Sequence, residues 1–121
     1  MLFRSKLVAN VSDLASSVER VGLIVSEKYK SPVCCVFSNQ VLNMRTNTTI
    51  GAAEDRCAIA GDGHELEIGF NVRYLADALR VIPSEEVMLE LTNGLSPIVL
   101  TPADEKYDYS YMVLPVRIKN G

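Results

Sequence analysis

The chain has 121 residues, of which 48% are hydrophobic and 22% are charged. A chain of this length forms one domain that buries about two thirds of the surface exposed in its unfolded form. The composition is typical of a globular domain and excludes a disordered chain. Twelve lysines and arginines against 15 aspartates and glutamates give a net charge of −3, which excludes binding to nucleic acid by charge over the whole surface. We therefore predict a single domain over residues 1–121.

Neither a membrane span nor a metal site is predicted. No apolar run approaches the ~20 residues that cross a bilayer, and the first residues lack the apolar core of a secretory signal. The three cysteines, Cys34, Cys35 and Cys57, are odd in number and lie in apolar segments without a CxxC motif or clustered histidines. We expect a cytoplasmic protein with no membrane contact, no cofactor, no metal, and buried, unbridged thiols.

The first half of the chain reads as a strand, a helix and three more strands. Residues 6–11 form the first strand, Ser12 is the expected N-cap, and the helix runs over residues 13–25. Strands are then predicted at residues 33–37, 41–46 and about 50–59. Four apolar residues at helical spacing predict that one face of the helix lies on a sheet. They are Leu14, Val18, Val21 and Val25.

The second half repeats this order. Residues 65–70 alternate as a strand, Asn71 is the expected N-cap of a second helix, and Pro83 limits it. The apolar stripe of this helix is Val72, Leu75, Ala76 and Leu79. The last strands are predicted at residues 87–91, 97–101 and 109–116. We predict an α+β domain of tandem β-α-β-β-β repeats, over about residues 6–59 and 64–118, with two helices packed on one face of antiparallel sheet.

Two segments resemble a known family. They read ELEIGFNVRYLADALRVI, over residues 65–82, and YSYMVLPVRI, over residues 109–118. They are similar to the C-terminal third domain of the bacterial DNA polymerase III β subunit, the sliding clamp, most specifically in EIGFN and MVLPVR. The resemblance implies the DNA-clamp (processivity) fold and a non-catalytic subunit. In that family two protomers of three domains each form a homodimeric ring around duplex DNA, so this chain alone is not expected to close a ring.

The resemblance further implies a hydrophobic pocket for short peptide motifs of DNA polymerases, the clamp loader and mismatch repair proteins. The matching positions are Tyr29, Asn71, Tyr74, Leu95, Ser96, Pro97, Met112, Val113, Leu114, Pro115, Val116 and Arg117. An apolar hole beside a sheet edge suits an extended peptide with one or two large apolar anchors. For Val113 and Val116 taken singly, an ordinary core position is the stronger interpretation.

A subunit interface is also implied by the resemblance. It comprises Ile24 and Val25 at the end of the first helix, together with Glu54 and Asp55 on an edge strand. An open strand edge is a ready template for pairing, and acidic side chains both guard it and select a basic partner. Burial in the domain's own core is an equal alternative for the two aliphatic residues.

Two arginines are candidates to face the DNA. Arg20 and Arg73 lie off the apolar stripes of the two helices, where the family's ring has its central hole. There they would meet phosphates without reading bases, so the DNA contact would be sequence-independent. Arginines that are simply solvated are the alternative at both positions.

Two other functions stay open. One is an enzyme in which Cys34 or Cys35 is a nucleophile and His64 its base, which is disfavoured because adjacent strand residues point to opposite faces. The other is a stand-alone clamp-like interaction domain that titrates or inhibits clamp partners.

Overall fold

The computed structural model describes residues 5–23, 32–38, 40–48, 51–62, 65–104 and 106–116. In chain order the elements are β1 (Ser5–Asn10), α1 (Val11–Gly22), β2 (Val33–Ser38), β3 (Val41–Thr48), β4 (Gly51–Asp62), β5 (Leu66–Phe70), α2 (Val72–Arg80), β6 (Glu86–Leu91), β7 (Ile98–Pro102), β8 (Tyr111–Val113) and β9 (Pro115–Val116). The order β-α-β-β-β is present twice, and the last strand of the second copy is broken into β8 and β9. The sequence predicted that last strand as continuous, which is wrong.

Each helix begins at an asparagine. The side-chain oxygen of Asn10 accepts a hydrogen bond from the Asp13 N–H at 3.0 Å, and the prediction of Ser12 as the N-cap of α1 is therefore wrong. Asn71 caps α2 as predicted, and accepts from the N–H groups of Arg73 and Tyr74 at 2.9 and 3.4 Å. Asparagine is favoured there because its oxygen satisfies N–H groups that have no partner inside the helix.

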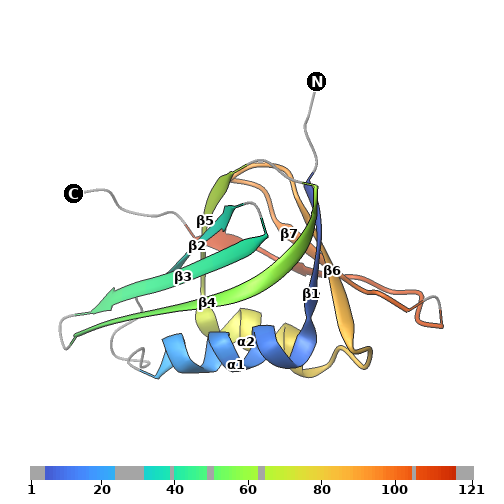
Figure 1. Ribbon diagram of the computed structural model, residues 1–121, viewed down its shortest axis with the longest axis horizontal. Helices are drawn as coiled ribbons and strands as arrows, with labels where there is room; N and C mark the ends of the chain where they lie inside the picture. Colours follow the sequence, from blue (N-terminus) through green and yellow to red (C-terminus); the bar gives the residue numbers. More distant parts are fainter. Residues whose placement is uncertain are drawn as a thin grey trace.

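The apolar stripes of both helices pack against the sheet. Leu14, Val18 and Val21 of α1 are each at most 2% exposed, as the helical spacing predicts, while Val25 lies outside the described residues. On α2 the same role falls to Leu75 and Leu79, which are also buried. The two helices lie side by side beneath the sheet (Figure 1). The prediction of two helices on one face of antiparallel sheet is confirmed.

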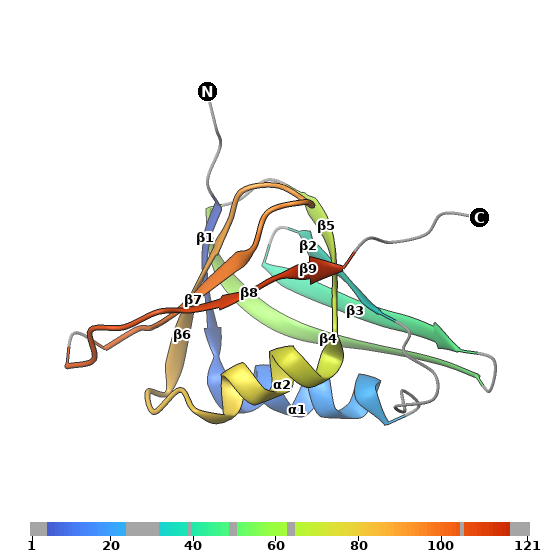
Figure 2. The ribbon, with the colours of Figure 1, turned by 180° about the vertical axis from the view of Figure 1, so that it is seen from behind.

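All nine strands form one antiparallel sheet in the order β8-β7-β6-β1-β4-β3-β2-β5-β9. β4 joins the two halves of this sheet, because residues 51–58 pair with β3 and residues 59–62 pair with β1. β8 and β9 repeat this arrangement, since β8 pairs with β7 and β9 pairs with β5. The sheet therefore curls over the helices, and only Leu114 separates its two end strands along the chain (Figure 2).

The core fills the space between the curled sheet and the helices. Its largest fully buried side chains are Phe70, Leu14, Leu42, Met44, Ile68, Leu79, Leu89, Leu91, Ile98 and Leu100. They come from both halves of the chain, so neither half encloses this core alone. In the described part of the chain, neither helix is long and apolar enough to cross a membrane.

Candidate functional site

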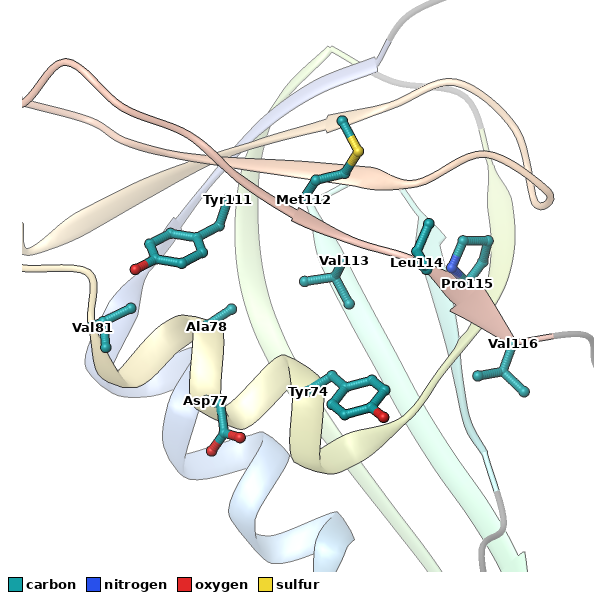
Figure 3. Close-up of a pocket in the computed structure, with 10 residues that line it drawn as sticks. All are labelled: Tyr74, Asp77, Ala78, Val81, Tyr111, Met112, Val113, Leu114, Pro115 and Val116. Atoms are coloured by element: carbon teal, nitrogen blue, oxygen red, sulfur yellow. The ribbon is translucent and has the colours of Figure 1, made fainter.

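A pocket with a volume of about 490 Å³ lies between α2 and the last strands of the sheet (Figure 3). From α2 and the residue that follows it come Tyr74, Asp77, Ala78 and Val81. The opposite wall is the continuous segment from Tyr111 to Val116. The pocket is thus built from two segments that are close in space and separated along the chain.

Helical spacing explains the α2 wall. Tyr74, Asp77, Ala78 and Val81 are separated by three, one and three residues, which places them on one face of the helix. Leu75 and Leu79 point into the core instead. Tyr74 is 62% exposed and Val81 is 50% exposed, so this face offers apolar area that the domain itself does not cover.

The strand wall alternates between core and surface. Val113 is 4% exposed and belongs to the core, whereas its neighbours Met112 and Leu114 are both 66% exposed. Neighbouring strand residues point to opposite sides, and the break at Leu114 between β8 and β9 adds a local bend. The apolar side chains of Met112 and Leu114 are therefore left largely uncovered by the described part of the domain.

The chemistry of the pocket is largely apolar. Among the lining residues that the structure describes, Asp77 alone has a charged side chain, and the Asp77 carboxylate lies 3.4 Å from an Arg80 nitrogen. β8 pairs with β7 and ends the sheet, so its other edge is not paired to a strand in the described structure. An unpaired strand edge next to an apolar pocket can bind an extended peptide through backbone hydrogen bonds and buried side chains.

The structure brings together half of the residues predicted for the pocket. Six line it: Tyr74, Met112, Val113, Leu114, Pro115 and Val116. Asn71 caps α2 and does not line the pocket, although it positions Tyr74. Leu95, Ser96 and Pro97 lie in the turn between β6 and β7 and are not among the lining residues. Tyr29 and Arg117 lie outside the described residues, and the peptide-binding role of all twelve stays a prediction.

Sequence analysis missed four lining residues, namely Asp77, Ala78, Val81 and Tyr111. A signal for three of them was present, because Asp77, Ala78 and Val81 follow Tyr74 at helical spacing. For Tyr111 no periodic signal exists, since the residue lines the pocket only because β8 lies opposite α2.

A second group of polar residues closes the outer edge of β4. Arg20 of α1 forms an ion pair with Asp55, and its Nη2 donates to the Ser17 hydroxyl at 3.2 Å. The pKa of Asp55 is lowered, chiefly because it accepts a hydrogen bond from Arg20. In turn the Ser17 hydroxyl donates to the Arg56 carbonyl at 3.2 Å, and the Arg56 N–H donates to the other Asp55 oxygen at 2.7 Å.

This network satisfies backbone groups on an open strand edge. The Ile59 N–H donates to the Gln40 carbonyl at 3.2 Å, so alternate residues of β4 point their backbone groups toward β3. Arg56 belongs to the other set of alternate residues. Its N–H and carbonyl therefore point to the opposite edge of β4, which no strand covers in the described structure. Asp55 thus takes part in a contact within the chain, which the sequence did not predict.

The other predicted surface residues are exposed. Glu54 lies on the outer face of β4, opposite Arg45 of β3. Arg73 is exposed at the start of α2, and the Arg20 side chain is 58% exposed beside Asp55. Ile24 and Val25 lie outside the described residues. Contacts of these residues with DNA or with another protomer stay predictions.

The cysteines do not form a reactive site in the described structure. Cys35 and Cys57 are buried and Cys34 is half-buried, so the prediction of buried thiols is wrong for Cys34. Burial raises the pKa of all three, which disfavours the thiolate that a nucleophile needs. His64 lies outside the described residues. Among those described, no three potential metal ligands cluster.

The solved structures that this fold matches include sliding clamps, and this is the class of protein that the fold indicates. The structure of the DNA polymerase III subunit beta from Pseudomonas aeruginosa matches with a TM-score of 0.86 at 32% identity, over 94% of this chain and 31% of that chain. A sliding clamp from Bartonella birtlesii, solved bound to griselimycin, matches with a TM-score of 0.86 at 30% identity, over 94% of this chain and 30% of that one.

The sequence comparison agrees with the structural one. The profile of the family described as DNA polymerase III beta subunit, C-terminal domain, matches residues 2–117. The beta sliding clamp of Pseudomonas putida is 32% identical over 112 residues, which are 93% of this chain and 30% of the relative. The chain belongs to this family of C-terminal domains of the DNA polymerase III beta subunit, as the two segments of its sequence predicted. It spans about 30% of the length of the relatives it matches.

Proposed function

We propose that this chain acts as the C-terminal domain of a replication processivity factor and binds short peptide motifs of other replication and repair proteins. The observation that carries the proposal is the apolar pocket of about 490 Å³ between α2 and β8. Its partners would be DNA polymerases, the clamp loader and mismatch repair proteins, and it would work in the bacterial cytoplasm. It would catalyse no reaction.

The pocket supports peptide capture on physical grounds. Tyr74, Met112 and Leu114 leave apolar surface uncovered at its rim. Burial of one large apolar anchor contributes on the order of 1.5–3 kcal/mol, from which the loss of peptide freedom is subtracted. A short motif with one or two anchors would therefore bind with modest affinity, which suits partners that exchange.

In a complete ring the same chain would contribute to encircling duplex DNA. Arg20 and Arg73 would face the hole and contact phosphates regardless of sequence. Ile24, Val25 and the outer edge of β4 near Glu54 would meet the other protomer in a homodimer. An overall charge of −3 supports encirclement over tight binding, because many phosphate contacts would slow sliding.

A direct test is an amide-resolved NMR titration of the 121-residue chain with a five-residue peptide of the Gln-x-x-Leu-Phe type. We expect Leu114→Ala and Tyr74→Ala each to weaken binding by roughly five- to thirtyfold, because each removes about 1–2 kcal/mol of apolar contact. Both side chains are more than 60% exposed, so the free energy of unfolding should change by less than about 1 kcal/mol.

Two variants serve as controls for this test. Leu23→Ala removes a leucine that is 82% exposed and is not among the lining residues of the pocket, and Arg20→Ala removes a charge on the other helix. Neither should change peptide affinity. Absence of amide shifts around the pocket at millimolar peptide, or equal weakening by Leu23→Ala, would count against the pocket as the binding site. Either result would mean that binding requires another domain of the full-length protein, or that the chain is a stand-alone domain that titrates clamp partners through another surface.

A further inference from the structure

Three tyrosines lead away from the pocket, from the first residue of β8 back along the chain. Tyr111 lines the pocket, and its ring centroid lies 5.7 Å from that of Tyr109 with the planes at 86°. The Tyr109 centroid lies 6.4 Å from that of Tyr107, at 72°. Tyr109 and Tyr111 are each 38% exposed. These residues, called here the tyrosine row, extend the aromatic surface beyond the pocket.

The tyrosine row is held in place by contacts at several points. The Tyr109 hydroxyl donates to the carbonyl of Val81, itself a lining residue of the pocket, at 3.3 Å. The Thr101 and Ser110 hydroxyls are 3.0 Å apart and share a hydrogen bond between β7 and the row. The Tyr107 N–H donates to the Asp104 carbonyl at 3.0 Å. The row is thus part of the fold and is continuous with the pocket wall.

Ring spacing in the row matches the repeat of an extended peptide. Two residues of a β-strand advance about 6.6 Å, and their side chains point to the same side. Distances of 5.7 and 6.4 Å between successive rings are close to this repeat. A peptide that follows the open edge of β8 and continues past Tyr111 would place alternate side chains over successive tyrosines.

The local charges favour a cationic side chain over these rings. The Lys106 ammonium lies 5.9 Å from the centroid of the Tyr107 ring, which is the cation–π geometry that an incoming cationic side chain would adopt at the other rings. Asp108 is exposed between Tyr107 and Tyr109, and Asp77, which is paired with Arg80 at 3.4 Å, lines the adjoining pocket. Arginine fits this setting well, because its planar guanidinium stacks on aromatic rings and pairs with carboxylates.

We infer that the tyrosine row is a second subsite, which binds an extended segment with arginines at alternate positions next to the apolar anchor of the partner peptide. This inference rests on the proposed function, because the anchor holds the segment beside the row. The row would select among partners according to the residues that flank their motif, in addition to the motif itself.

The test compares peptides that share one five-residue apolar motif. One carries Arg-Ser-Arg before the motif, one carries it after the motif, and a matched pair carries Gln-Ser-Gln. Affinities for the 121-residue chain are measured by calorimetry at a single salt concentration. We expect one of the arginine peptides to bind about five- to tenfold more tightly than its glutamine match, as two cation–π contacts would give.

A variant of the row completes the test. Tyr107→Leu keeps apolar volume and removes the ring, so it should reduce the gain from arginine while affinity for the bare motif is unchanged. The inference would be overturned if the arginine and glutamine peptides bound with equal affinity. It would also be overturned if Tyr107→Leu kept the whole increase in affinity that arginine gives over glutamine. Either result would leave the proposed function standing. Failure of the bare motif and of every extended peptide to bind would overturn both.

Discussion

Gly61 occupies a position on β4 where no other residue fits without strain. It lies opposite Leu7 of β1, and its backbone φ is +125°, in the region that favours glycine. A Cβ added there would lie 2.4 Å from the Lys6 carbonyl oxygen, which belongs to the backbone and cannot swing away. The pairing of β4 with β1 therefore depends on the absence of a side chain at this point.

We expect Gly61→Ala to lower the free energy of unfolding by about 2 kcal/mol or more, through backbone strain and the contact with Lys6. Urea unfolding followed by circular dichroism measures this. Gly51→Ala is the matched control, since Gly51 also has a positive φ and none of the described residues lies within 4 Å of its added Cβ. An equal effect of the two substitutions would show that the contact with Lys6 is unimportant.

The sequence of a single segment predicts the local role of a residue better than it predicts which distant residues that residue contacts. Asn71 was recognised as a cap because the reason for it is local. Leu95 and Met112 are both exposed apolar residues of predicted pocket segments, yet only Met112 lines the pocket. That difference depends on which loop lies across from α2, and no local pattern encodes it. Recognition of the family supplied most of the site, and spacing alone would have supplied only the α2 wall.

The contact between α1 and β4 contributes to the stability of the domain in a way that depends on pH. Arg20 pairs with Asp55, whose side chain is only 21% exposed and whose pKa is lowered. A carboxylate with a lowered folded pKa adds stability above its unfolded pKa of about 3.9, and this stability is lost as pH falls through the folded value. The pair therefore contributes at neutral pH and stops contributing in acid.

We expect Arg20→Ala to lower the urea midpoint of unfolding at pH 7. The difference in midpoint between this variant and the parent chain should become smaller as pH is lowered from about 4 to about 2. Urea titrations at a series of pH values measure this. Arg80→Ala is the control, because the Arg80–Asp77 pair is far more exposed and should change the midpoint little at any pH. A difference in midpoint that does not change with pH would mean that Arg20 stabilises the domain by packing alone.

The limits of a helix or strand can be predicted where apolar residues recur at regular spacing. They cannot be predicted where pairing with distant strands sets them. The alternating strands at β2 and β6 appear within one residue of their predicted limits. The break between β8 and β9 was missed, because the apolar run from Tyr109 to Val116 has no breaker except Pro115. The strand bends there because its first part pairs with β7 and its second with β5, at opposite ends of the sheet order.

At the scale of the whole molecule, the open edges determine how the chain associates. No strand of the described structure pairs with the outer edge of β4 along residues 51–58, and the backbone groups of Arg56 on that edge are already bonded to Asp55 and Ser17. We therefore expect this edge not to pair with a second copy of itself, and the 121-residue chain alone to be a monomer of 13.3 kDa in size-exclusion chromatography with light scattering. A stable dimer would contradict this expectation and favour a domain that pairs with itself.

Equivalent positions on the two helices, counted from the capping residues Asn10 and Asn71, have different roles in the two halves of the domain. The seventh residue after Asn10 is Ser17 and the tenth is Arg20, and both close the edge of β4. Counted from Asn71, the same places hold Ala78 and Val81, and there the strand edge beside the helix stays open as a pocket. At equivalent positions of the two repeats, polar side chains thus bond to a strand edge in one half of the domain, and apolar side chains line a pocket in the other.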